Sequence, residues 1–200
     1  MEGFYFYWCS WACWIFATFL MKKTKARTML AAAVLISIML SIYHITIGVF
    51  SITLSFLFAL VIAYYFITKK SGWKLVYMLL SMMMVSFVYA ACHLLILIDP
   101  VWMLIDKTWM VAIMLTFVCL MLHHHFQERL LCIIAGSCQG EMMYAFVIKT
   151  YSFPYAIGSL AFLDELSLSC VCLALWSALE NISVYADMVH KQMKRNKPLL

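Results

Sequence analysis

The chain has 200 residues, of which 66% are hydrophobic and only 12% are charged, and its formal net charge is +5. A soluble domain carries about 25% charged residues, so a water-soluble fold of this length could not cover so much apolar surface. The composition excludes a separate soluble module for catalysis or nucleic-acid binding. It predicts one integral membrane domain over residues 1–200, with the lipid bilayer as its principal partner.

The apolar runs predict seven transmembrane helices, because crossing the hydrocarbon core of a bilayer takes about 20 apolar residues. The charge-free run 28–68 would be about 60 Å long as a single helix, so we divide it at the turn-like sequence 44–48. In chain order, the predicted spans lie near residues 4–21, 28–45, 49–67, 75–98, 108–126, 130–148 and 166–186.

The seventh span has two possible positions. A span over 155–177 would bring Asp164 and Glu165 to the middle of the membrane, whereas a span over 166–186 leaves them at its outer mouth. We favour 166–186 because it buries fewer charges and sets the two acids at the positive end of the helix dipole. Within this span only Glu180 is charged, and we expect it to reach the inner interface.

The basic residues give the orientation. With the N-terminus outside and the C-terminus cytoplasmic, twelve of the fourteen Lys and Arg residues fall on the inner side, as the positive-inside rule requires. Only Lys107 and Lys149 then lie outside. The predicted fold is therefore an all-α polytopic bundle of about seven spans.

The last two spans contain the unusual polar residues. Glu141 lies 11 residues into the sixth span, near the membrane midplane, where an acid costs at least about 2.5–3.5 kcal/mol. It follows Gln139, and Gly136 and Gly140 form a GxxxG pattern that allows a neighbouring helix to approach closely. We interpret Glu141 either as a proton, ion or polar-substrate site or as a neutral acid hydrogen-bonded across the bundle.

Other polar side chains fall in the same outer half of the membrane. His44, His93, Asp164 and Glu165 could join Glu141 in one proton-relay or metal site. Their spacing leaves open whether they converge, and the alternative is that each is interfacial or packed separately. Consecutive residues 123–125 are all His, but helical neighbours project about 100° apart, so we assign them to a solvated inner cap. No metal is assigned.

The sequence contains no HExxH, GxSxG or P-loop pattern, and nothing in it implies a cofactor. The eight Cys residues all lie in or beside apolar runs and are interpreted as packing residues. The leading functional hypothesis is a structural or regulatory membrane protein that acts through helix–helix contacts, by self-association or with other membrane proteins. The alternative is a small proton- or ion-coupled transporter that uses Glu141, and an intramembrane enzyme is the third and weakest hypothesis.

The N-terminal segment resembles a known family. The opening Met1-Glu2-Gly3, the Phe6-Tyr7-Trp8 element and the run Phe19-Leu20-Met21-Lys22-Lys23 are similar to the start of the YphA-type membrane proteins of spore-forming bacilli. The resemblance covers about the first 25 residues. It implies a multi-pass protein of a bacterial plasma membrane and supplies no catalytic residue.

Overall fold

The computed structural model describes residues 2–47, 50–99, 106–151 and 155–195, with side chains described as far as residue 182. The described residues form seven α-helices, one short π-helical segment and three short strands. In chain order these elements are α1 (Phe4–Ile15), η1 (Phe16–Leu20), α2 (Lys25–Leu40), β1 (His44–Ile47), β2 (Phe50–Thr53), α3 (Leu54–Thr68), α4 (Trp73–Ile98), α5 (Lys107–Leu122), α6 (Phe126–Thr150), β3 (Ala156–Ile157) and α7 (Leu160–Arg195).

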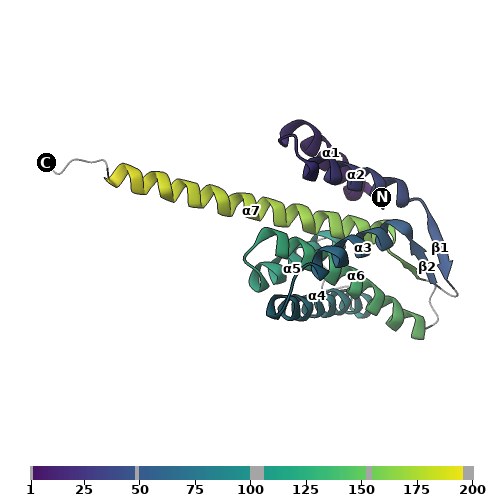
Figure 1. Cartoon of the computed structure of the whole chain (residues 1–200). Coiled ribbons are helices and arrows are strands. Elements are labelled where there is room, and N and C mark those ends of the chain that lie inside the picture. The colour runs from purple at the N-terminus through teal and green to yellow at the C-terminus, as the bar shows by residue number, and fades with distance from the viewer. Residues whose placement is uncertain (1, 48–49, 100–105, 152–154, 196–200) are drawn as a thin grey trace.

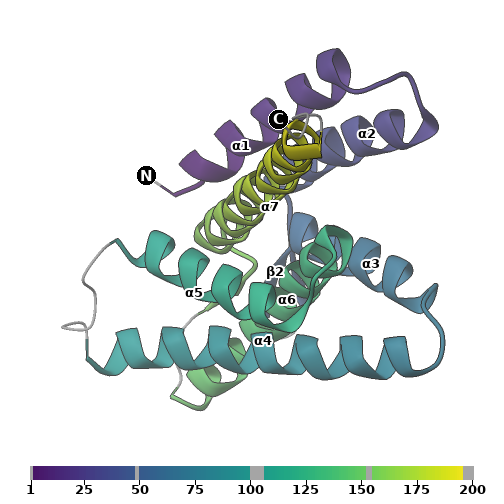
Figure 2. The same ribbon diagram turned by 90° about the vertical axis from the view of Figure 1, so that its left-hand side faces the viewer.

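The long helix α7 divides the molecule. On one side it packs against α1, which pairs with α2, and on the other it packs against α5 and α6 (Figure 1). Helix α4 lies across the far side of α6, and α3 packs against α6 from a third direction (Figure 2). Helix α6 is therefore the most enclosed of the helices, with α3, α4, α5 and α7 all in contact with it.

The two ends of the bundle differ in composition. One end, which we call the basic end, contains the α1–α2, α3–α4 and α5–α6 connections and their lysines, together with Arg129. The other, which we call the sheet end, contains the three strands, the end of α4, the start of α5 and the start of α7 (Figure 1). The end of α6, with Lys149 in its last turn, also lies there, because α6 contacts β3.

Length and surface composition match a membrane environment. Among the described helices, Trp73–Ile98, Phe126–Thr150 and the Leu160–Ile182 part of α7 are long and apolar enough to cross a bilayer. Large apolar side chains such as Trp8 and Ile98 are 67% and 79% exposed, as lipid-facing residues would be. The predicted helical membrane bundle is confirmed, whereas the count of seven spans and the orientation stay predictions.

The boundary between the second and third predicted spans was wrong. Helix α2 ends at Leu40, and β1 pairs in antiparallel fashion with β2, to which β3 adds in parallel. The sequence of β1 and β2 is rich in Ile and Thr, whose branched side chains favour strands over helices. The fold therefore adds a small sheet to the predicted all-α bundle, and α3 begins at Leu54 rather than near residue 49.

The helix that contains the predicted seventh span begins earlier than that span. Helix α7 begins at Leu160, six residues before the predicted residue 166. The hydroxyl of Ser159 accepts a hydrogen bond from the backbone N–H of Phe162 at 3.4 Å, which is a typical N-terminal cap. Asp164 and Glu165 consequently lie inside the helix and are 4% and 2% exposed, so they are not acids of an open outer mouth.

Candidate functional site

The site begins with a close contact between α4 and α6. A Cβ atom added to Gly140 would lie 2.7 Å from the Cβ of Tyr89, and one added to Gly136 would lie 2.7 Å from the Cβ of Val85. Both distances are shorter than side chains tolerate, so the two glycines allow the helices to approach. This face of α6 is covered by α4 of the same chain. Because α4 and α6 lie so close together, the Tyr89 side chain reaches the carboxyl group of Glu141.

Glu141 is fully buried and accepts three hydrogen bonds. Its Oε2 accepts from the hydroxyl of Tyr89 at 2.8 Å, and its Oε1 accepts from the hydroxyl of Tyr155 at 2.8 Å. The backbone N–H of Gly158 donates to the same Oε1 at 3.2 Å. Gly158 has a φ of +72°, and a Cβ there would lie 2.4 Å from that of Phe56, so glycine is required at this position.

A second buried carboxyl group lies beside the first. Oε2 of Glu165 is 3.2 Å from the hydroxyl oxygen of Tyr89 and 3.0 Å from Nε2 of His93. The His93 ring stacks on the Tyr89 ring with a centroid distance of 4.3 Å. On its other side, Oε1 of Glu165 lies 3.7 Å from the ammonium nitrogen of Lys107, whose side chain is 40% exposed.

These contacts form a continuous chain of polar side chains from the surface to the centre of α6. We call it the carboxyl network, and its members are Lys107, Glu165, His93, Tyr89, Glu141 and Tyr155. Lys107 forms its exposed end, at the start of α5. The Tyr89 hydroxyl has one proton, so it donates to only one of the two carboxyl groups at a time. The network can therefore exist in at least two hydrogen-bonded arrangements.

One buried atom of the network has no partner. Nδ1 of His93 forms no hydrogen bond with any described residue, although the His93 side chain is only 3% exposed. A neutral imidazole has one nitrogen that donates and one that accepts, and the bond from Nε2 selects between the two tautomers. His93 thus uses one ring nitrogen to contact Glu165 and leaves the other without a described hydrogen-bond partner.

Asp164 lies next to Glu165 but faces away from the network. Its carboxyl oxygens accept the backbone N–H groups of Gly3 at 2.6 Å and Phe6 at 2.7 Å. A carboxylate satisfies the free N–H groups at the start of a helix and is favoured there by the helix dipole. Asp164 therefore caps α1 from α7 and holds the two helices together.

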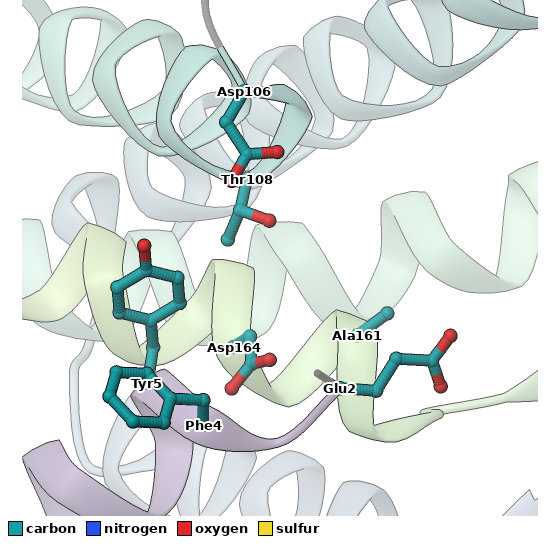
Figure 3. Close-up of a pocket in the computed structure, with 7 residues that line it drawn as sticks. All are labelled: Glu2, Phe4, Tyr5, Asp106, Thr108, Ala161 and Asp164. Atoms are coloured by element: carbon teal, nitrogen blue, oxygen red, sulfur yellow. The ribbon is translucent and has the colours of Figure 1, made fainter.

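A cavity of about 440 Å³ lies at the sheet end, between the start of α5 and the starts of α1 and α7. Figure 3 shows Asp106 and Thr108, at the start of α5, across the opening from Asp164 and from Glu2 and Tyr5 of the N-terminal segment. Three carboxyl groups surround this space. The cavity is adjacent to Lys107, which follows Asp106 in sequence and contacts Glu165.

The other predicted site residues lie elsewhere. Nδ1 of His44 is 3.3 Å from the hydroxyl of Thr53 in the sheet, and the amide nitrogen of Gln139 donates to the hydroxyl of Tyr64 on α3. Gln139 is two positions from Glu141, so its side chain leaves α6 on another face. Of the set considered for convergence, the structure brings together His93, Glu141 and Glu165. Among the residues described, no three His, Cys, Asp or Glu side chains are arranged to hold a metal ion.

Sequence reasoning missed Tyr89, Tyr155, Gly158 and Lys107. Tyr89 could have been found, because it precedes His93 by four residues and so shares its helical face. Tyr155 and Gly158 follow α6 in an irregular segment, where no periodic pattern predicts which side chains turn inward. Lys107 was interpreted only as an outside loop residue, because nothing in its spacing from Glu165, which was expected on the same outer side, indicates that the two side chains pair.

Comparisons with known proteins extend the N-terminal resemblance. Residues 2–199 match the family model described as YphA-like integral membrane protein. The chain is also 30% identical over 196 residues to "Uncharacterized protein YphA" of Bacillus subtilis (strain 168), an alignment covering 98% of this chain and 96% of that protein. No solved structure matches the chain significantly. The family predicted from the first 25 residues is thus confirmed over nearly the whole length.

Proposed function

Because the chain belongs to the YphA-like integral membrane protein family, we propose that it acts within the bilayer, where it binds protons and moves them by way of Glu141 and Glu165. We assign this activity to a bacterial plasma membrane, with the sheet end outside and the basic end in the cytoplasm. The observation that carries the proposal is the Tyr89 hydroxyl, which lies within hydrogen-bond distance of both buried carboxyl groups.

The proton step follows from these contacts. When Glu165 is protonated, its proton passes to the Tyr89 oxygen while the Tyr89 hydroxyl proton passes to Glu141. Glu165 becomes a carboxylate, Glu141 becomes a neutral acid, and Tyr89 is neutral before and after the transfer. His93 and Lys107, which both contact Glu165, stabilise its carboxylate once the proton has left.

The carboxyl groups around the cavity support entry of protons at the sheet end. Glu2, Asp106 and Asp164 surround that space, and a cluster of acids raises the local concentration of cations, including protons. At the inner side of Glu141, the hydroxyl of Ser137 is buried one helical turn away and has no hydrogen-bond partner in the described residues. It is the next polar group along the same face of α6 and is a candidate for continuing the path.

The helix-contact hypothesis has less support. Its proposed surface was the face of Gly136 and Gly140, and that face packs against α4 of the same chain. A partner helix could reach these glycines only by displacing α4. We therefore rank proton movement ahead of partner binding through this face.

Proton flux into liposomes tests the proposal. The full-length protein is reconstituted with a pH-sensitive dye inside the vesicles, and a potassium diffusion potential drives proton entry. We expect flux above that of empty liposomes for the unchanged protein and flux at the empty-liposome level for Glu141→Gln. The control is Glu128→Gln, which makes the same chemical change at the basic end, where Glu128 pairs with Lys70.

The control variant should conduct like the unchanged protein. Equal flux in Glu141→Gln and the unchanged protein, with both folded, would show that Glu141 is not the proton site. Flux of the unchanged protein no greater than that of empty liposomes would contradict proton movement altogether.

A further inference from the structure

A second pocket lies at the basic end, far from the carboxyl network. It has a volume of about 300 Å³ and is formed where the start of α4 meets the α5–α6 connection. Four of its lining residues carry basic side chains, namely Lys70, Lys74, His123 and His125. We call this space the basic pocket. The proton path proposed above involves none of its residues.

The charges in the basic pocket are only partly paired. The ammonium nitrogen of Lys70 is 2.7 Å from Oε1 of Glu128, and Oε2 of Glu128 is 3.6 Å from Nδ1 of His123. These contacts fix Lys70 in place. Lys74 is exposed and has no hydrogen bond or ion pair within the described part of the chain, so its charge is available to an anion.

An apolar stripe leads away from the basic pocket along α4. Trp73 and Tyr77 line the pocket and are 87% and 49% exposed, and Leu80 and Met84 follow them at 61% and 55%. The spacing of 4, 3 and 4 residues sets all four side chains on one face of the helix. Trp and Tyr at the pocket followed by aliphatic side chains match the change from headgroup region to hydrocarbon.

We propose that the basic pocket binds the phosphate of an anionic membrane phospholipid, whose acyl chains lie along the α4 stripe. Lys74 and Lys70 supply the positive charge, and basic pockets between helices at the cytoplasmic side suit anionic headgroups. A free phosphate ion would use the same lysines but would make no contact with Leu80 and Met84. The stripe therefore favours a lipid over a free anion as the source of the phosphate.

Native mass spectrometry of the full-length protein in detergent tests the proposal. Phosphatidylglycerol and phosphatidylcholine with identical acyl chains are titrated separately, and the bound fraction is compared. We expect preferential retention of phosphatidylglycerol, and we expect that preference to fall roughly tenfold in Lys70→Gln/Lys74→Gln, since each lysine near a headgroup contributes substantially to binding. The matched control, Lys22→Gln/Lys23→Gln, removes two exposed lysines from the α1–α2 connection and should keep the preference.

Lys74→Gln alone provides a second variant, because Lys74 has no hydrogen-bond or ion-pair partner among the described residues whose loss could unfold the protein. It should lower the preference by a smaller factor than the double variant. Equal binding of the two lipids, or an equal loss in the control variant, would overturn the assigned pocket. Inorganic phosphate is the third probe: if it displaces phosphatidylglycerol at equal concentration, the site is one for a free anion and the lipid proposal is wrong.

Discussion

Charged side chains are buried at both ends of the bundle, but they are neutralised differently. At the basic end, the guanidinium of Arg129 contacts the two carboxylate oxygens of Glu180 at 2.7 and 3.2 Å, and its Nε donates to the His123 carbonyl at 2.7 Å. Trp176 adds a further hydrogen bond to Glu180. Arg129 and Glu180 are thus fixed partners of opposite sign, so the pair links α6 to α7 and has no proton to exchange.

At the sheet end, buried acids outnumber buried bases. Glu141 and Glu165 share one tyrosine hydroxyl, and the permanent positive charge in contact with Glu165 is the partly exposed Lys107. An excess of carboxyl groups in a low-dielectric site is easily relieved by binding a proton, whereas a balanced ion pair is not. We therefore propose a structural role for the basic end and a proton-binding role for the sheet end.

The largest expected effect is on stability at the basic end. Glu180→Ala leaves the guanidinium of Arg129, whose side chain is 5% exposed, without a carboxylate. We expect a loss of about 3 kcal/mol in the free energy of unfolding, near the lower end for a broken buried pair because Glu180 is 43% exposed. Unfolding in detergent measures this loss. Arg129→Met/Glu180→Leu should recover most of it, and a double variant as unstable as the single one would contradict the structural role.

The α4–α6 contact gives the second prediction. Gly140→Ala forces a methyl group against Tyr89, and we expect a loss of about 2 kcal/mol together with reduced proton flux. Gly136→Ala meets Val85 instead and should cost a similar free energy, because its Cβ would lie equally close to a neighbour. Since it is one turn away from Tyr89, proton flux per folded molecule should persist. Equal proton flux in the two variants would show that the carboxyl network does not depend on the close approach of Gly140 to Tyr89.

Tyr89→Phe should have a smaller effect on the free energy of unfolding, but it should abolish proton transfer between the two carboxyl groups. It removes one hydrogen bond to Glu141, worth about 1 kcal/mol, and it interrupts the connection between the carboxyl groups. Tyr77→Phe is the matched control on the same helix, because the Tyr77 hydroxyl donates to the Leu122 carbonyl at the basic end. Both variants should lose similar stability in thermal unfolding, and only Tyr89→Phe should lose flux in liposomes.

The smallest expected effects concern two lysines that are partly exposed to solvent. Lys107→Gln and Lys70→Gln each remove a lysine whose side chain contacts solvent, and each should change the free energy of unfolding by less than about 1 kcal/mol. Similarly small changes in the two variants would mean that the difference between the two ends comes from their buried side chains and not from these lysines. A loss of several kcal/mol from Lys107→Gln would instead assign a structural role to the sheet end.

The sequence predicted much of this architecture because hydrophobic length is a strong signal in a bilayer. Runs such as 75–98 and 130–148 correspond closely to α4 and α6, since charges or prolines end them. The pairing of β1 and β2 was missed because the hydrophobicity of residues such as Ile and Thr does not by itself distinguish a short strand from a helix. The strand state of β2 depends on pairing with residues 156 and 157, more than a hundred positions away.

The site was only partly predictable for a related reason. Glu141 stands out in sequence because an acid within an apolar span is rare, but its partners come from three other segments. Asp164 and Glu165 are adjacent in sequence and were treated as a pair, yet they point in different directions along α7. One caps α1 and the other joins the carboxyl network. His123 was expected in a solvated cap but is 4% exposed, because it packs beneath Tyr77 and beside Glu128.

We propose that Glu141 and Glu165 bind protons as a coupled pair, and the protonation of these two carboxyl groups can be measured directly. Infrared difference spectroscopy of the full-length protein, titrated through pH, detects the carbonyl stretch of protonated carboxylic acids. We expect a band from buried protonated acids that changes with pH. The Glu141 part of this band should be lost in Glu141→Gln, and the band should be altered in Tyr89→Phe. A spectrum of the unchanged protein with no such band, or one identical in Glu141→Gln, would contradict this proposal.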